Sequence, residues 1–227
     1  MEEIKYNVVF SRRRTISIIV SPDKTVTVRA PLRASLKTIN KFVQDKSAWI
    51  KKHLNSSPGL NLTDKGKQYT DGEFHLFMGR EYALRKIASV NPFVRQTEDV
   101  IEVGQNFTDN RDKTKRLLEI WYIRQAGEIL TGLLKDIIRN NGDYKFSPTR
   151  LVIRPLKSRW GSCTSKGKIT LNSELVKLDH LLIEYVIIHE LCHLKFHNHG
   201  ANFYNLLAEL VPDYKSIRKE LRKYITI

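Results

Sequence analysis

The sequence predicts an α+β fold with a β-rich N-terminal lobe. Two observations predict it. Short β-branched runs of alternating polarity recur through the first 110 residues, whereas residues 111–227 carry long apolar helical patterns around one basic strand–loop–strand segment. A chain of 227 residues with 41% hydrophobic content suits one domain or a domain with a smaller lobe. We therefore expect residues 1–110 to form a β-rich lobe with one helix, and residues 111–227 to form a second region.

The N-terminal half begins with two runs that alternate like half-buried strands. Residues 12–20 and 24–30 are these runs, and the turn sequence Ser21–Lys24, with Pro at its second position, joins them. Ser35 is placed to cap a helix over residues 36–54, where apolar residues recur near helical spacing. Short apolar runs separated by turns predict further strands between Phe74 and Val103.

The C-terminal half begins with a long helix predicted from Thr114 to about Arg139, with Asn141-Gly142 as its C-cap. Two short strands follow, "RLVIRPL" and "GKITLNS", which flank the loop "KSRWGSCTSK". Asp179 is placed to cap the next helix, "HLLIEYVIIHELCHL", and one or two shorter helices are expected from Ala201 onward. The order is thus a β-rich front, a long helix, a basic hairpin and a helical tail.

Composition predicts a cytoplasmic protein. The N-terminus has no apolar signal-peptide region, no apolar run approaches the ~18 residues that cross a bilayer, and Cys163 and Cys192 do not make a disulfide framework. No membrane partner or obligate protein partner is indicated. The net charge of +15 favours polyanionic partners such as nucleic acid, nucleotides or acidic substrates, although a solvated basic surface has the same composition.

The stretch "HELCHLKFHNHG", residues 189–200, carries four of the seven histidines. His189 and His193 lie one turn apart on nearly the same helix face, so both imidazoles can address one ion. Glu190 lies at the edge of that face, placed to reach a water ligand. The surrounding helix is apolar nearly all round, which implies burial, and a buried carboxylate needs compensation such as a divalent cation. This H-E-x-x-H pattern predicts a zinc hydrolase site.

Zinc in a hydrolase needs a third protein ligand and an open position for water. The candidates are His197, His199, Glu209, Asp213 and Glu220. His197 would lie too far along the axis if the helix continued. His199 can reach the metal only if the chain leaves the helix between about Phe196 and Asn198, and Asn198 and Gly200 tolerate the left-handed turn that this requires. A glutamate ligand, Glu209 or Glu220, stays open, whereas a metzincin is excluded because no Met follows the site.

The segment "RPLKSRWGSCTSKGKITLN" is basic and contains no carboxylate. An edge strand here could bind an extended peptide through its main chain, and basic side chains could hold phosphate oxygens. We predict that Trp160 and both cysteines pack in the interior. The predicted substrate-binding residues are Arg154, Lys157, Lys168, Thr170 and Asn172.

Several segments together resemble the YgjP-like metallopeptidase family, which is related to the SprT-like and WLM zincins. They are "RWGSC", "KITLN", "IEYVIIHELCHL", "NHGANFY" and "VPDY", with "GREYALR" and "WIKKHL" in the front half. The resemblance covers nearly the whole chain. It implies a zincin-like metallohydrolase domain over residues 111–227, with His189 and His193 as ligands, Glu190 as general base and His199, from the family's Asn-His pair, as third ligand. Gly200 stands where the family more often has Ser.

The predicted reaction is hydrolysis by a metal-activated water. One Zn²⁺ or another divalent metal activates the water, Glu190 takes its proton and passes it to the leaving group, and Arg159 stabilises the oxyanion, with Tyr204 or Tyr214 as weaker choices. A cytoplasmic metallopeptidase is favoured. A nucleotide pyrophosphatase, with the basic hairpin holding phosphates, is the first alternative, and a DNA-associated SprT-like protease is the second.

Overall fold

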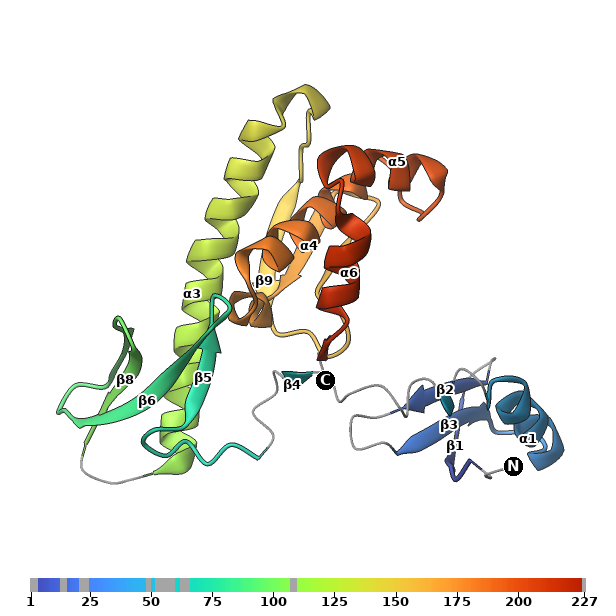
Figure 1. Cartoon of the computed structure of the whole chain (residues 1–227), viewed down its shortest axis with the longest axis horizontal. Coiled ribbons are helices and arrows are strands. Elements are labelled where there is room, and N and C mark those ends of the chain that lie inside the picture. The colour runs from blue at the N-terminus through green and yellow to red at the C-terminus, as the bar shows by residue number, and fades with distance from the viewer. Residues whose placement is uncertain are drawn as a thin grey trace. The chain divides into compact units, whose positions relative to one another are not determined.

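The structure is a computed structural model of the whole chain, and it describes residues 4–12, 16–20, 25–47, 50–51, 60–61, 66–106 and 110–225 (Figure 1). The chain separates into two compact units, Met1–Leu60 and Asn61–Ile227. The predicted lobe boundary near residue 110 falls inside the second unit, between a strand and the long helix. The division into lobes at that point stays a prediction.

The first unit is a small sheet with one helix. Strand β3 (Val26–Pro31) lies in the centre, parallel to β1 (Asn7–Ser11) and antiparallel to β2 (Ser17–Val20). Helix α1 (Leu36–Asp45) begins at Ser35, whose side chain accepts a hydrogen bond from the Thr38 amide, which confirms the predicted cap. The turn Ser21–Lys24 and much of the predicted helix beyond Lys46 lie outside the described residues.

The core of the first unit is formed by alternate residues of β3 and by one face of the helical segment that follows. Its buried members are Val26, Val28, Ala30, Ile39, Val43 and Ile50. The alternation that predicted the strand therefore also places its apolar side chains on one face.

The second unit begins with a four-stranded sheet, after the two-residue strand β4 (Leu60–Asn61). Its order is β5 (Phe74–Phe77), β6 (Arg80–Ala88), β8 (Val100–Gln105) and β7 (Phe93–Gln96). The sheet packs on the long helix α3 (Arg111–Asn140), where Phe77 contacts Trp121 and the Tyr122 hydroxyl donates to the Leu76 carbonyl. Helix α3 begins three residues before the predicted Thr114 because Asn110 caps it by accepting from the Lys113 amide.

The basic segment forms three strands rather than the predicted two-stranded hairpin. Strand β11 (Lys168–Asn172) lies in the centre, parallel to β9 (Arg150–Arg154) and antiparallel to β10 (Gly161–Cys163). The chain reverses between β10 and β11 at Gly167, which has a φ of +75° and donates to the Thr164 carbonyl. The predicted loop "KSRWGSCTSK" thus contains the edge strand β10.

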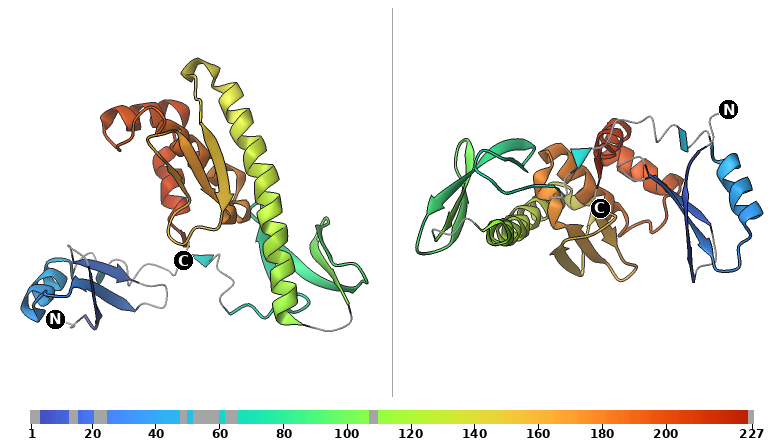
Figure 2. Two further views of the ribbon diagram at one scale, coloured as in Figure 1. Left: turned by 180° about the vertical axis from the view of Figure 1, so that it is seen from behind. Right: turned by 90° about the horizontal axis from the view of Figure 1, so that it is seen from below.

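Helices complete the second unit. The 3-10 turns η1 (Gly142–Tyr144) and η2 (Ser173–Lys177) precede α4 (His180–Cys192), α5 (Ala201–Leu210), α6 (Tyr214–Leu221) and the short strand β12 (Tyr224–Ile225). Views from two sides show α4 beside the three-stranded sheet, with α3 running along both (Figure 2). Asp179 caps α4 by accepting from the Leu181 amide, as predicted. The α+β class with a β-rich N-terminal region is confirmed.

No helix in the described part of the chain combines the length and apolar character that spanning a bilayer requires. Cys163 and Cys192 are both free thiols. Cys192 is buried, as predicted, whereas Cys163 is only half-buried.

Candidate metal centre

Helix α4 holds the first part of the site in the middle of the core. Its apolar residues Ile183, Ile187 and Leu191 are fully buried and pack among residues of α3, β11 and α5. Such packing fixes the helix and leaves little freedom for the polar side chains set into it. Helix α4 ends at Cys192, and His193 follows as its C-cap, with its amide donating to the His189 carbonyl.

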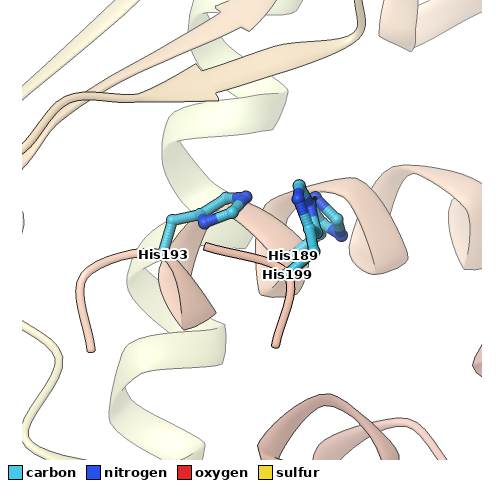
Figure 3. A group of neighbouring side chains, drawn as sticks. All are labelled: His189, His193 and His199. Carbon is cyan, nitrogen blue, oxygen red and sulfur yellow. Dashed lines mark hydrogen bonds between the residues drawn. The ribbon is translucent and has the colours of Figure 1, made fainter. Parts of the chain in front are cut away.

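Three imidazoles converge beside this helix end. His189, His193 and His199 each offer a ring nitrogen, and these three atoms lie within 4.8 Å of one another. Figure 3 shows the rings of His189 and His193, from α4 and its cap, gathered with that of His199, which comes from the following loop. The Nε2 atoms of His189 and His199 are 3.1 Å apart. The loop therefore returns His199 to the helix face that carries the other two.

The chain makes this return without a left-handed residue, contrary to our prediction. Gly200 has a φ of −81°, and Asn198 is not among the residues of positive φ. The reason is that α4 stops at Cys192, so six residues, rather than two or three, are available to reverse the chain before His199.

The three imidazoles fit a divalent metal. Two nitrogen ligands held about 2.0–2.1 Å from a tetrahedral ion lie roughly 3.3 Å apart, close to the observed separation of the two Nε2 atoms. His193 Nδ1 lies 3.1 Å from the Phe196 carbonyl oxygen, which orients its ring and leaves Nε2 as the free ligand atom. Burial and the neighbouring imidazoles lower the pKa of His189 to about 3, and burial lowers that of His193. Both rings are thus neutral at pH 7, as metal ligation requires.

Phe203, on α5, supports all three rings. Its side chain is fully buried, and its ring centroid lies 5.0 Å from that of His189, 4.6 Å from His193 and 4.7 Å from His199. A single apolar contact shared by the three imidazoles limits their rotation. In the sequence, the spacing of Phe203 identifies it only as a core position of α5, so its place beneath the imidazoles could not be predicted.

The other predicted ligand candidates do not belong to this cluster. Glu209 accepts a hydrogen bond of 2.7 Å from the Tyr144 hydroxyl, and Glu220 pairs with Lys223 at 2.6 Å. His197 and Asp213 are exposed. Among the described residues, only the three histidines form a group of metal-binding geometry.

Glu190 lies next to the cluster and is buried, with 5% of its surface exposed. Burial raises the pKa of its carboxyl group to about 7, and the nearby Arg159 guanidinium opposes this rise. Its Oε2 atom is buried without a hydrogen-bond partner. A carboxyl group of this kind is poised between its two protonation states near pH 7 and needs a partner from outside the chain.

Gly161 makes room for that carboxyl group. A Cβ atom added to Gly161 would lie 2.7 Å from Glu190 Oε1 and 2.8 Å from its Cγ. Gly161 begins the edge strand β10, so the glutamate side chain rests directly on the strand backbone.

A pocket of about 500 Å³ opens beside Glu190 and His189. Three arginines line it, namely Arg159 before β10, Arg218 on α6 and Arg222 at the end of α6. The predicted oxyanion stabiliser, Arg159, therefore lies at this pocket.

Comparison with protein families identifies the chain. Residues 14–224 match the model of the YgjP-like metallopeptidase domain, which covers both units. The chain belongs to the YgjP-like metallopeptidase family. The family expected from the sequence motifs is therefore the correct one, and membership makes this a protein of a metal-dependent peptidase family.

Two solved structures are also similar to this YgjP-like protein. The metallopeptidase zymogen jannalysin of Methanocaldococcus jannaschii shares 25% identity over 41% of this chain and 94% of its own, with a TM-score of 0.37. The zymogen abylysin of Pyrococcus abyssi shares 28% identity over 40% of this chain and 90% of its own, with a TM-score of 0.36. A search of curated proteins gives no match.

Two predicted substrate contacts of this YgjP-like protein differ from the structure. Asn172 is fully buried, and its side-chain amide forms four hydrogen bonds with the surrounding chain. Its Oδ1 accepts from the Leu156 and Glu174 amides, and its Nδ2 donates to the Leu156 and Arg159 carbonyls. The residue therefore holds the loop before β10 and has no capacity left for a substrate. Thr170 is buried too, because β11 is the central strand and its main chain is already paired on both sides.

The free edge that sequence reasoning assigned near "KITLN" belongs instead to β10. Arg154, Lys157 and Lys168 are exposed and are not among the residues that line the pocket, so their roles stay predictions. The arginines at positions 218 and 222 carried no signal in the sequence, because only packing of α6 against α4 brings them to the pocket.

Proposed function

We propose that the chain is a zinc-dependent peptidase in which His189, His193 and His199 hold one Zn²⁺ and Glu190 is the general base. The observation that carries the proposal is the convergence of three imidazole nitrogens, within 4.8 Å of one another, beside a buried carboxyl group with a pKa of about 7. Neutral imidazoles are the ligands that zinc prefers at a catalytic site, and three of them leave a fourth position open.

Zinc bound there would supply Lewis acidity to a water molecule and to the peptide carbonyl. Glu190 accepts the proton of the attacking water at its unpartnered Oε2 atom and then delivers it to the leaving amine. A carboxyl pKa near 7 suits both transfers, because the group gives and takes a proton with little free-energy difference at neutral pH. Arg159 lines the same pocket as this carboxyl group, where its charge can stabilise negative charge that develops on the carbonyl oxygen.

Strand β10 supplies a binding edge for the peptide. It pairs with β11 on one side only, and its first residue, Gly161, touches Glu190. An extended peptide that pairs with the free side would have its main chain held beside the general base. We also propose a cytoplasmic location, since both cysteines are free and a reducing compartment keeps them so.

A nucleotide pyrophosphatase is the second candidate. The observation in its favour is the arginine pocket, because guanidinium groups bind phosphate oxygens as readily as they bind carboxylates. Hydrolysis at phosphorus would use the same metal and the same base. Nucleic-acid binding is favoured only by the net charge of +15, and we do not include it in the proposal.

The test is a comparison of Glu190→Gln with Glu184→Gln, a glutamate of the same helix that pairs with His180. Purified wild-type protein is expected to carry about one zinc per chain, and both variants are expected to keep it. Only Glu190→Gln should lose hydrolysis of unstructured protein, scored by new amino termini, by about 10²–10⁴-fold. A nucleoside triphosphate panel, scored for pyrophosphate, separates the second candidate. Wild-type protein that binds no zinc, or a Glu190→Gln variant with full turnover, would overturn the proposal.

A further inference from the structure

The pocket beside the metal centre has an unusual distribution of charge. Arg159, Arg218 and Arg222 line it, and of the described lining residues only Glu190 carries a carboxyl group. The arginine ion pairs seen in the described part of the chain involve other arginines, at positions 85, 95, 124 and 139. Three arginines therefore line one pocket that holds a single carboxyl group among its described lining residues, and no described residue forms a salt bridge with them.

The arginines are close to the atoms that the proposed function uses. His189 and Glu190 line the same pocket as the three arginines. Arg218 Nη1 donates to the Tyr204 hydroxyl at 3.4 Å, which leaves the rest of its guanidinium group available. An anion bound among them would sit directly next to the reacting bond.

Two of these residues carry like charges at neighbouring positions of α6. Arg218 and Arg222 are four residues apart at the end of α6, and the Arg222 amide donates to the Arg218 carbonyl. Residues at this spacing are neighbours on the helix surface, and like charges there destabilise a helix. Leu221 and Tyr185 also line the pocket, so part of its wall is apolar.

The pocket has the size of a side-chain subsite. A volume of about 500 Å³ lies within the range of roughly 300–1,000 Å³ that is usual for small-ligand pockets, and it opens beside Glu190. A planar guanidinium fork matches a carboxylate in two parallel hydrogen bonds. The hydroxyls of Tyr185 and Tyr224, which also line the pocket, can donate to the same kind of group.

We propose that this pocket binds a carboxylate of the peptide substrate, next to the bond that is cleaved, through Arg159, Arg218 and Arg222. The inference rests on the proposed peptidase function and names its substrate class: peptides with an acidic residue, or with the terminal carboxylate, beside the scissile bond. Because a substrate carboxylate offsets the positive charge of the arginines, a productive complex with an acidic peptide is more stable than one with a neutral or basic peptide.

The experiment uses the zinc-loaded full chain and peptides that are identical except for Glu, Gln or Lys at each position beside the scissile bond. Each peptide is made with a free and with an amidated C-terminus, so that a side-chain carboxylate and a terminal carboxylate are distinguished. We expect kcat/KM to be about tenfold or more higher for the carboxylate-bearing member of a pair. The ratio should fall when salt is raised, because screening weakens exposed charge pairs.

Matched variants locate the effect. Arg218→Gln and Arg222→Gln are each expected to reduce the Glu-over-Gln ratio several-fold, and Arg222→Glu should shift the preference toward the Lys peptide. Lys219→Gln removes a positive charge from the same helix at an exposed position outside the pocket, and the ratio should be unchanged. Circular dichroism and thermal unfolding establish that each variant is folded.

A binding measurement separates failure of the pocket from failure of the peptidase function. Glu190→Gln is titrated with the same labelled peptides and with a nucleoside triphosphate, and fluorescence anisotropy reports the dissociation constants. Tighter binding of the carboxylate peptides, lost on adding Arg222→Gln, would support the pocket even if no peptide is cleaved. Equal kcat/KM and equal affinity for Glu and Gln peptides would overturn the inference, as would binding of the triphosphate without binding of any acidic peptide.

Discussion

Gly161→Ala is the substitution whose effect follows most directly from the geometry of the site. The added Cβ would lie 2.7, 2.8 and 2.9 Å from the Oε1, Cγ and Cδ atoms of Glu190. Gly161 has no positive φ, so alanine is compatible with the backbone of β10. The closest contacts of the added atom are therefore all with one side chain, that of Glu190, the proposed general base.

The magnitude follows from these contacts. Non-bonded carbon atoms prefer about 3.5–4.0 Å, so the carboxyl group of Glu190 must retreat by roughly 0.7–1 Å. A misplacement of about 1 Å can cost on the order of 10²-fold in rate, or about 2.7 kcal/mol of transition-state stabilisation. The clash is with a side chain that can rotate, so we expect the free energy of unfolding to fall by only about 1 kcal/mol, at the low end for an overpacked site.

The assay compares kcat/KM for one peptide, zinc content and thermal unfolding in the wild type, Gly161→Ala and Gly132→Ala. Gly132 lies in α3 with no heavy atom within 4 Å of an added Cβ, so it controls for the chemical change itself. That control should be as active as the wild type and more stable by about 0.5–1 kcal/mol. Folded, zinc-loaded Gly161→Ala with wild-type kcat/KM would refute the contact between the strand and the base.

Three further predictions concern the ligands and the base. His199→Ala should sharply reduce zinc affinity in a chelator competition, whereas His197→Ala should not; equal losses would contradict the assigned ligand set. Glu209→Gln should leave zinc affinity unchanged, because Glu209 is engaged by Tyr144; loss of zinc would favour a carboxylate ligand. In metal-free protein the infrared band of the Glu190 carboxyl group should titrate near pH 7, with the group neutral below this pH and charged above it. Zinc should lower this pKa, because a nearby cation favours the carboxylate. An unshifted pKa near 4.5 without metal would contradict its burial.

Features that depend on neighbours in sequence could be predicted with good success. Asp179 and Ser35 each bond the first turn of the helix that follows, because an N-cap needs only its own side chain and an amide two or three residues later. His189 and His193 could be placed on one helix face, with Glu190 at its edge, for the same reason, since helical spacing alone sets their directions.

Strand β10 could not be predicted in this way. Its three residues, Gly161–Cys163, are too few to show alternation, and it exists because β11 offers a partner and Gly167 allows the chain to reverse. The predicted substrate-binding residues were affected as a result. Because β10 lies at the edge of the sheet, Asn172 lies in the interior and forms hydrogen bonds with the preceding loop. The pairing of the strands thus determines which side chains a substrate could contact.

The arginines of the pocket could not be predicted either, because they are far apart in the sequence. Arg159 and Arg218 are 59 positions apart in sequence, and they meet because β10 and α6 both pack against α4. The +15 net charge indicated anionic partners but could not say where the charge gathers, because a sum over the chain contains no positions. Helix α4 therefore connects the histidine cluster with the arginine pocket. Its imidazoles face the proposed metal position, Glu190 contacts β10, and residues of its flank line the arginine pocket. A substrate held by its carboxylate in that pocket would therefore have its neighbouring bond beside the proposed base.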